Sequence, residues 1–244
     1  MQIEGRVALV TGSAQRIGRS VVLALAEKGA DVVIHYQHSA KEAEATAGEC
    51  RRLGVDVLIA RANLTKAQEV DRLFRHIVKK FRRLDILVNN AAVFPKTPFL
   101  KCKETEWDHV LDTNLKGSFL CAQRAAKIML RRGSGKIINI ADWSGLRPYT
   151  GYLPYCVSKG GVITLTKALA LELAPKIQVA CIAPGPILLP KNYTKEEAKQ
   201  VKGKVPLKRI GTPQDIARTV LFLLEGTDFI TGSMILVDGG ESIA

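Results

Sequence analysis

The chain has 244 residues, of which 47% are hydrophobic and 24% are charged. These proportions are those of a globular protein, and they exclude disorder as the main state because burial of the apolar surface offsets the entropy of chain ordering. No apolar run approaches the roughly 18 residues of a membrane span. The apolar run that follows Glu4 and Arg6 is shorter than a signal-peptide core of about 7–15 residues. We therefore expect a cytoplasmic protein.

The 36 Lys and Arg residues outnumber the 23 Asp and Glu residues, which gives a net charge of +13. The basic residues fall in short scattered groups with no groove-reading motif, so we expect neither nucleic acid nor a membrane surface as a partner. The excess favours solubility and attraction of anionic cofactors and substrates. The five cysteines lie far apart without a CxxC pair, which predicts reduced thiols and no metal site.

Short runs rich in Val and Ile alternate with helical patterns along the chain. The expected strands cover residues 7–10, 31–36, 55–60, 85–88, 136–140, 179–182 and 234–237. The expected helices cover 17–28, 41–53, 70–78, 106–132 with Gly117 as a candidate break, 155–174, and 213–224 with Thr212 as its cap. Residues 184–205 show no clear period. The pattern predicts an α/β fold, a single domain over 1–244 with a parallel seven-stranded sheet and helices on both faces.

The first strand is followed by the segment Thr11–Gly18, in the place of a dinucleotide-binding loop. Gly12 permits a sharp turn, Gly18 lets the helix pack closely, and the helix N-terminus faces phosphates. A plain turn is the alternative. The end of the second strand, residues 35–39, carries no acid to bind ribose hydroxyls, which favours NADPH over NADH. Arg16 and Ser39 are the groups able to hold its 2′-phosphate.

Tyr155 and Lys159 are four residues apart in a predicted helix and therefore share a face. A lysine cation beside a phenol favours the phenolate and lowers the tyrosine pKa. The pair would make Tyr155 a proton donor near neutral pH. An exposed helix pair is the alternative interpretation.

Together, these motifs resemble the short-chain dehydrogenase/reductase family. Its features occur in order along the whole chain: Thr11-Gly12 with Gly18, Asn89-Asn90-Ala91, Asn114, Tyr155 with Lys159, Pro184-Gly185 and Val237-Asp238-Gly239-Gly240. The resemblance implies a Rossmann fold and hydride transfer from a nicotinamide. It implies that Tyr155 donates the proton, Lys159 holds the nicotinamide ribose and Asn114 steadies a relay water. It also implies a homotetramer built from the helices at 106–132 and 155–174, and a substrate loop at 186–205.

The cofactor-binding residues that follow from the loop and from the resemblance are Gly12, Arg16, Ile17, Gly18, His35, Tyr36, Ser39, Asn63, Leu64, Asn90, Ala91, Tyr155, Lys159, Pro184 and Gly185. Two positions depart from the common family pattern. Arg16 replaces the middle glycine of the loop, and Asp142, 13 residues before Tyr155, replaces the catalytic serine.

Both departures resemble the pteridine reductase subgroup, as do His35-Tyr36 with Ser39-Ala40, Phe94, and Lys204-Val205-Pro206-Leu207. His38 stands where that subgroup has arginine, and Asn63 replaces an aspartate beside the adenine. This resemblance implies a planar heterocyclic substrate, an oxidised pterin or a dihydrofolate-like ring. Phe94 and the nicotinamide would sandwich the ring, and Asp142 and Tyr155 would protonate its nitrogen.

Other interpretations of these residues remain open. Phe94 is also consistent with a core aromatic side chain, and Asp142 with a solvent-facing residue beside Ser144 as the hydroxyl donor. The alternative activity is an NADPH-dependent reductase of a 3-oxoacyl thioester or another small carbonyl compound. A non-enzymatic NADPH-binding protein is a third hypothesis, against which the intact Asn114, Tyr155 and Lys159 argue.

Overall fold

The computed structural model describes residues 1–189 and 193–244. Within them, seven parallel strands form one sheet in the order β3-β2-β1-β4-β5-β6-β7. The strands are β1 Val7–Val10, β2 Asp31–Tyr36, β3 Val57–Arg61, β4 Ile86–Asn89, β5 Gly135–Ile140, β6 Ile177–Pro184 and β7 Met234–Val237. The predicted single-domain α/β fold with a seven-stranded parallel sheet is confirmed.

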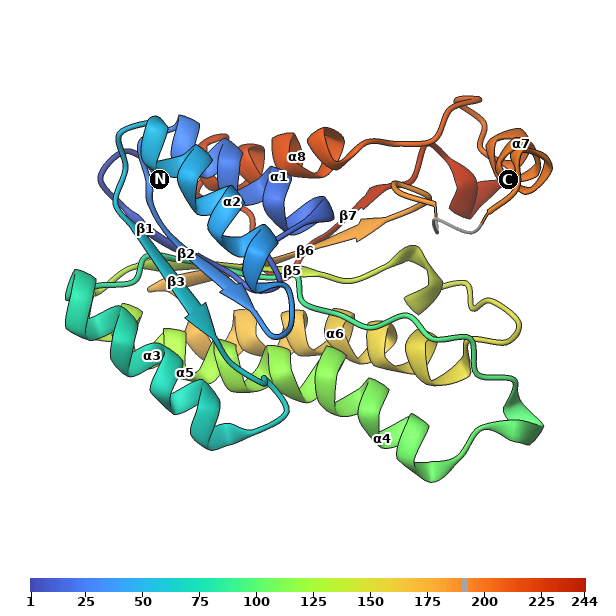
Figure 1. Ribbon diagram of the computed structural model, residues 1–244, viewed down its shortest axis with the longest axis horizontal. Helices are drawn as coiled ribbons and strands as arrows, with labels where there is room; N and C mark the ends of the chain where they lie inside the picture. Colours follow the sequence, from blue (N-terminus) through green and yellow to red (C-terminus); the bar gives the residue numbers. More distant parts are fainter. Residues whose placement is uncertain (190–192) are drawn as a thin grey trace.

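Helices cover both faces of this sheet (Figure 1). One face carries α1 Arg16–Glu27, α2 Ala40–Arg52 and α8 Pro213–Glu225, and the other carries α3 Ala67–Phe81, α5 Gly117–Arg132 and α6 Leu153–Leu173. Separate apolar cores therefore fill the two sides of the sheet. Because both faces are covered, β1 is buried at every residue, which explains its continuous apolar sequence.

The direction in which successive strands are added to the sheet reverses between β1 and β4. From β1 the chain builds outward through β2 to β3, and it then returns to place β4 on the other side of β1. The connections after β4, β5 and β6 extend beyond the carboxyl ends of the strands, toward α4 Glu104–Leu111 and α7 Lys195–Lys204 (Figure 1). Ligands of open parallel sheets bind at such a reversal.

Two segments add detail to their predicted structure. The helix expected at 106–132 is divided by a π-helical turn, Asp112–Lys116, and α5 begins at Gly117, the predicted candidate break. The segment without clear period contains α7, which begins with a capping box formed by Thr194 and Glu197. None of the α7 residues is buried, so the helix has no apolar stripe and the cap was its only sequence signal. The predicted Thr212 cap of α8 is confirmed.

No helix within residues 1–189 and 193–244 is both long enough and apolar enough to span a membrane.

A buried carboxylate joins the amino-terminal ends of β1 and β4, on the side of the sheet opposite to the carboxyl ends of the strands. Asp85 is 2% exposed and accepts the Val7 N–H at 2.9 Å. The Arg83 guanidinium donates to both of its oxygens at 2.7 Å. The fork-to-fork geometry matches guanidinium to carboxylate, and it leaves the buried charge paired.

We predict that Asp85→Ala lowers the free energy of unfolding by about 2–4 kcal/mol, because it strands a buried N–H and leaves Arg83 without its partner. Urea denaturation measures the change. Glu44→Ala, which breaks the exposed pair with Arg51, is the control and should cost less than about 1 kcal/mol. Equal losses in the two variants would contradict the role given to Asp85.

Candidate active site

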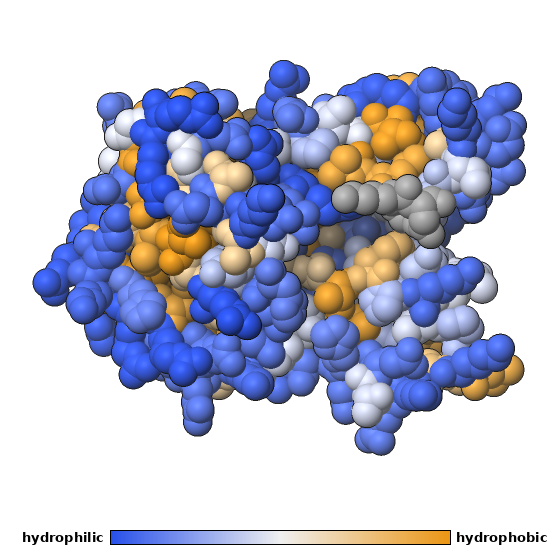
Figure 2. All heavy atoms as spheres, viewed as in Figure 1, coloured by the Kyte–Doolittle hydropathy of each residue, from blue (hydrophilic) through white to orange (hydrophobic). Residues whose placement is uncertain are grey.

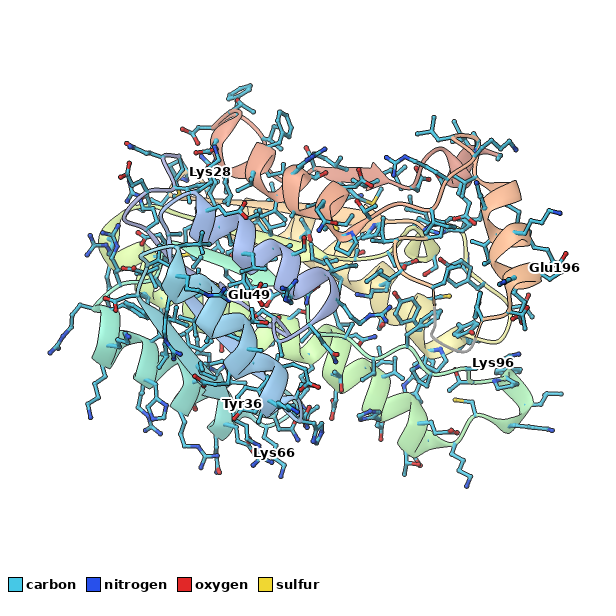
Figure 3. All side chains as sticks on the ribbon, turned by 45° about the horizontal axis from the view of Figure 1, so that its top comes forward. Lys28, Tyr36, Glu49, Lys66, Lys96 and Glu196 are labelled. Carbon is cyan, nitrogen blue, oxygen red and sulfur yellow. The ribbon has the colours of Figure 1, made fainter. Side chains whose placement is uncertain are left out.

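A cleft of about 690 Å³ lies beyond the carboxyl ends of the strands. Every predicted cofactor and substrate residue lines it, and among the predicted site residues only Asn114 does not. Figure 2 shows this side of the molecule hollowed, with hydrophobic residues on the walls. In Figure 3, Tyr36 lies on one side, at the end of β2, and Lys96 and Glu196 lie on the far side. The cleft thus spans the sheet from the β2 end to α7.

The loop between β1 and α1 has the left-handed backbone of a phosphate-binding turn. Gly12 has φ +64° and Arg16 has φ +57°, so Arg16 adopts a conformation that suits glycine, at a cost of about 1 kcal/mol. Its guanidinium donates to the Leu188 carbonyl at 3.2 Å, across the cleft, whereas the Ser39 hydroxyl pairs with Gln15. The two groups expected to share a phosphate therefore point to different partners.

His35, in β2, holds this loop through two hydrogen bonds of its ring. Its Nδ1 accepts the Gly12 N–H at 3.0 Å, so Nε2 carries the hydrogen and donates to the Ala62 carbonyl at 3.0 Å. Burial lowers the pKa of His35 to about 4, and the ring is uncharged at neutral pH. His35 therefore shapes the loop, and it brings no positive charge to a phosphate.

The end of β4 interlocks with the same loop. The Thr11 hydroxyl accepts the N–H groups of Asn90 at 2.9 Å and Ala91 at 3.0 Å. The Asn90 amide in turn donates to the Thr11 carbonyl at 2.8 Å. At Gly18, a Cβ atom would overlap the Gly12 carbonyl oxygen and lie 2.6 Å from the Asn90 amide nitrogen. Only glycine fits there, and the N-terminus of α1 consequently opens into the cleft, where it favours an anion.

Two further predicted cofactor residues, Asn63 and Gly185, are held by hydrogen bonds. The Asn63 side-chain oxygen accepts both the Thr65 N–H, at 3.0 Å, and the Thr65 hydroxyl, at 2.9 Å. The Gly185 N–H donates to the Val237 carbonyl at 3.0 Å. A Cβ atom at Gly185 would lie 2.7 Å from the Asp238 Cα, so the two C-terminal motifs meet at a glycine contact.

Tyr155 and Lys159 project from α6 to the floor of the cleft. The Tyr155 hydroxyl donates to Asp142 Oδ2 at 2.9 Å, and the Lys159 ammonium donates to the Ile140 carbonyl at 2.9 Å. Burial, followed by the Asp142 charge, raises the Tyr155 pKa well above its ordinary value, and burial lowers the Lys159 pKa. The expectation that Lys159 lowers the Tyr155 pKa is therefore wrong here, because a carboxylate, not the lysine, holds the phenol.

Asp142 is held by three donors. It accepts the Tyr155 hydroxyl on one oxygen, and the Tyr149 hydroxyl at 3.1 Å and the Ser144 N–H at 2.8 Å on the other. The alternative of a solvent-facing Asp142 is not what the structure shows. Ser144 is fully buried, and its hydroxyl has no hydrogen-bond partner among the described residues, so it is not placed to serve a substrate.

Asn114 lies beneath the cleft, in the π-helical turn. Its side-chain oxygen accepts the Val93 N–H at 2.8 Å, and its nitrogen donates to the Val93 carbonyl and the Ser158 hydroxyl, each at 3.0 Å. The amide therefore fixes the segment after β4 against α6. Its role in holding a relay water stays a prediction.

An aromatic wall completes the cleft. Phe94 is 46% exposed, and its ring stacks on Tyr152 with centroids 4.3 Å apart and meets the Tyr155 ring edge-on at 4.5 Å. Phe94 is therefore not a core residue. Sequence reasoning missed Tyr149 and Tyr152, although the three tyrosines recur at intervals of three residues.

We predict that Gly18→Ala lowers the affinity for a nicotinamide dinucleotide at least about 100-fold, because the methyl group forces apart the loop that receives the diphosphate. Fluorescence titration measures the dissociation constant. The control is Gly48→Ala in α2, where a Cβ meets nothing within 4 Å. It should leave binding unchanged and stabilise the fold by up to about 1 kcal/mol. Normal binding by Gly18→Ala would refute the loop assignment.

Comparison with known proteins places the whole chain in one group of enzymes. A family model described as enoyl-(acyl carrier protein) reductase matches residues 12–242. The 3-oxoacyl-[acyl-carrier-protein] reductase FabG of Staphylococcus aureus strain Mu50 is 43% identical over 237 residues, covering 96% of each chain. A 3-oxoacyl-[acyl-carrier-protein] reductase of Synechocystis is 40% identical over 245 residues, covering 98% of this chain and 97% of its own.

Solved structures agree with this placement. A 7α-hydroxysteroid dehydrogenase, complexed with NADH and 7-oxo glycochenodeoxycholic acid, has a TM-score of 0.94 and 30% identity, over 98% of this chain and 95% of that one. An actinorhodin polyketide ketoreductase with NADPH has a TM-score of 0.92 and 30% identity, over 98% of both chains.

The predicted pteridine reductase activity is wrong, because the Staphylococcus and Synechocystis relatives are 3-oxoacyl-[acyl-carrier-protein] reductases. That prediction depended on a few positions, chiefly Arg16, Asp142 and Phe94. The structure gives the reason it misled. Phe94 packs on Tyr152 as part of a general aromatic wall, and such a wall accommodates an acyl chain as well as a flat ring. A planar heterocyclic substrate has no support.

The loop, the Tyr155–Lys159 pair and the parallel sheet are thus combined in a chain that matches its relatives from end to end. The protein is an oxidoreductase that belongs to the short-chain dehydrogenase/reductase family, whose members use a nicotinamide cofactor.

Proposed function

We propose that this protein is an NADPH-dependent reductase of 3-oxoacyl thioesters. The observation that carries the proposal is its 43% identity, over 96% of the chain, to a 3-oxoacyl-[acyl-carrier-protein] reductase. The site supports the same chemistry, because a buried phenol, Tyr155, lies at the floor of an accessible cleft. A proton donor in that place is what reduction of a ketone to an alcohol requires.

The residues present fit a dinucleotide. The first residues of α1, Arg16, Ile17 and Gly18, line the cleft, so the N-terminus of the helix would face a diphosphate. When bound, the nicotinamide supplies the hydride to the 3-oxo carbon. Lys159 would hold the nicotinamide ribose, as the family resemblance implies.

Tyr155 would deliver the proton to the substrate oxygen as negative charge develops on it. Asp142 Oδ2 lies 2.9 Å from the phenol oxygen and accepts its hydrogen bond, so Asp142 would orient the Tyr155 hydroxyl. A serine at this position would donate to the substrate oxygen directly, whereas Asp142 would act through the phenol. One proton and one hydride then convert the ketone to a hydroxyl group.

The outer cleft suits an acyl chain. Its walls include Phe94, Tyr152, Leu188, Tyr193 and Val201, and hydrophobic residues lie above and below the hollow in Figure 2. We assign this part to the substrate, with the predicted loop at 186–205 as its border. Residues 190–192 of that loop lie outside the described part of the chain.

NADPH is proposed over NADH because the adenosine end of the cleft lacks a carboxylate. Tyr36, Gln37, His38 and Ser39 line it after β2. An acid there would bond the ribose hydroxyls of NADH and repel a 2′-phosphate. His38 and the Ser39 hydroxyl are able to donate hydrogen bonds to the phosphate, and Arg16 adds positive charge nearby.

We further propose a homotetramer in the cytoplasm. Exposed apolar side chains lie on the two helices expected to form the interface, namely Phe119 and Leu130 on α5 and Val157 and Leu171 on α6. A second copy would cover them. All five cysteines are free, as suits a reducing compartment.

For the cofactor, we predict at least about tenfold tighter binding of NADPH than of NADH, which corresponds to about 1.4 kcal/mol. Tyr36→Asp places a carboxylate at the end of β2 and should reduce or reverse this preference. Fluorescence titration of both cofactors against both proteins measures it. Equal dissociation constants in the unmodified protein would show that the absence of an acid does not select NADPH.

For the reaction, we predict that Tyr155→Phe keeps the NADPH dissociation constant within about twofold and lowers turnover of an acetoacetyl thioester by about 10²–10⁴-fold, the contribution of a positioned acid. The measurement is NADPH oxidation at saturating substrate. Turnover close to that of the unmodified enzyme would assign the proton to another group, with Asp142 the first to test.

A further inference from the structure

Tyr149 shares the Asp142 carboxyl with Tyr155. It lies in the connection before α6, and its hydroxyl donates to Asp142 Oδ1 at 3.1 Å, while Tyr155 donates to Oδ2 at 2.9 Å. Each carboxyl oxygen thus accepts one phenol. Neither the family motifs nor the proposed reaction assigns a task to Tyr149.

We propose that Tyr149 is a positioning residue of the reductase, which holds the Asp142 carboxyl with one oxygen turned toward Tyr155; this rests on the proposed function. The end torsion of an aspartate side chain is broad and is not fixed by its rotamer. The Ser144 N–H contacts only Oδ1 and fixes that oxygen from one direction. The Tyr149 hydroxyl supplies a second fixed donor to the same oxygen, and the plane of the carboxyl group is then set.

The Tyr149 ring is itself held in place. Trp143 packs edge-on against it with centroids 5.2 Å apart, and Phe94 does so at 6.4 Å. The main-chain N–H of Tyr149 donates to the Cys156 sulfur at 3.4 Å, which ties the connection to the first turns of α6. Burial and the Asp142 charge raise the pKa of Tyr149, so its hydroxyl keeps the hydrogen that it donates.

The other ionisable groups around Asp142 come from two elements. Lys159 faces it from α6, together with Tyr155, and Glu241 faces it from the C-terminal 3₁₀ turn, Glu241–Ile243. All of them are retained when only the Tyr149 hydroxyl is removed. A change in pH dependence in that variant therefore reports the lost hydrogen bond.

The test is Tyr149→Phe, which removes one hydroxyl and keeps the ring. With NADPH and an acetoacetyl thioester, we expect kcat to fall about tenfold, the contribution of one well-placed hydrogen bond, with KM within about twofold. The pH dependence of kcat should also change, because the Asp142 carboxyl loses one of its hydrogen-bond donors. In an Asp142→Ala background, Tyr149→Phe should change kcat less than about twofold.

A tenfold loss that persists in the Asp142→Ala background would overturn the proposal, because Tyr149 would then act by packing alone. Tyr152→Phe is the control for the pH profile, since it removes a hydroxyl from the same wall without touching Asp142. Its profile should keep the shape of the unmodified enzyme, and a matching shift would contradict the role of Tyr149.

A substrate-free measurement separates this proposal from the proposed function. The carbon-13 signal of the Asp142 carboxyl, assigned by its loss in Asp142→Ala, should move in Tyr149→Phe and stay in place in Tyr152→Phe. If no 3-oxoacyl thioester is reduced, the proposed function fails, and the carboxyl signal still decides whether Tyr149 holds Asp142. An unmoved signal in Tyr149→Phe overturns the positioning role.

Discussion

The close approach of three chain segments at Gly18 is the constraint on which the site depends. The loop after β1, the first turn of α1 and the end of β4 meet there so tightly that a Cβ atom has no room. Hydrogen bonds between Thr11 and Asn90 tie the loop to the end of β4, and His35 of β2 accepts the Gly12 N–H of the loop. The N-terminus of α1 opens to the cleft only because this packing draws the helix against the sheet.

The second decisive contact is between Asp142 and Tyr155. It makes the phenol a neutral, buried hydrogen-bond donor, and it removes the simple picture in which Lys159 alone prepares the tyrosine for proton transfer. A serine at this position offers a hydroxyl to the substrate, whereas a carboxyl offers an acceptor or a transferable proton. We therefore assign the proton transfer to Tyr155 and the orientation of its hydroxyl to Asp142.

Most of the fold was readable from the sequence because buried parallel strands are continuous apolar runs and their helices begin and end at Gly, Pro and capping residues. The break in the long helix was predicted at Gly117, but the π-helical form of Asp112–Lys116 was not readable, since the Asn114 amide, bonded to Val93 and Ser158, lies within it. Nor was α7, which buries no apolar stripe.

The cleft residues were found because each follows a strand or lies one turn from another on α6. Tyr149 and the true setting of Tyr155 depend on contacts that only the folded chain provides. The predicted substrate was wrong because it depended on single substitutions and not on the similarity of the whole chain.

Substrate choice tests the central claim most directly. NADPH oxidation by the purified protein should be followed with an acetoacetyl thioester and, in parallel, with a dihydropterin. Our account predicts turnover of the thioester, with a 3-hydroxyacyl product, and at least about tenfold lower kcat/KM for the dihydropterin. Turnover of the dihydropterin with none of the thioester would contradict it.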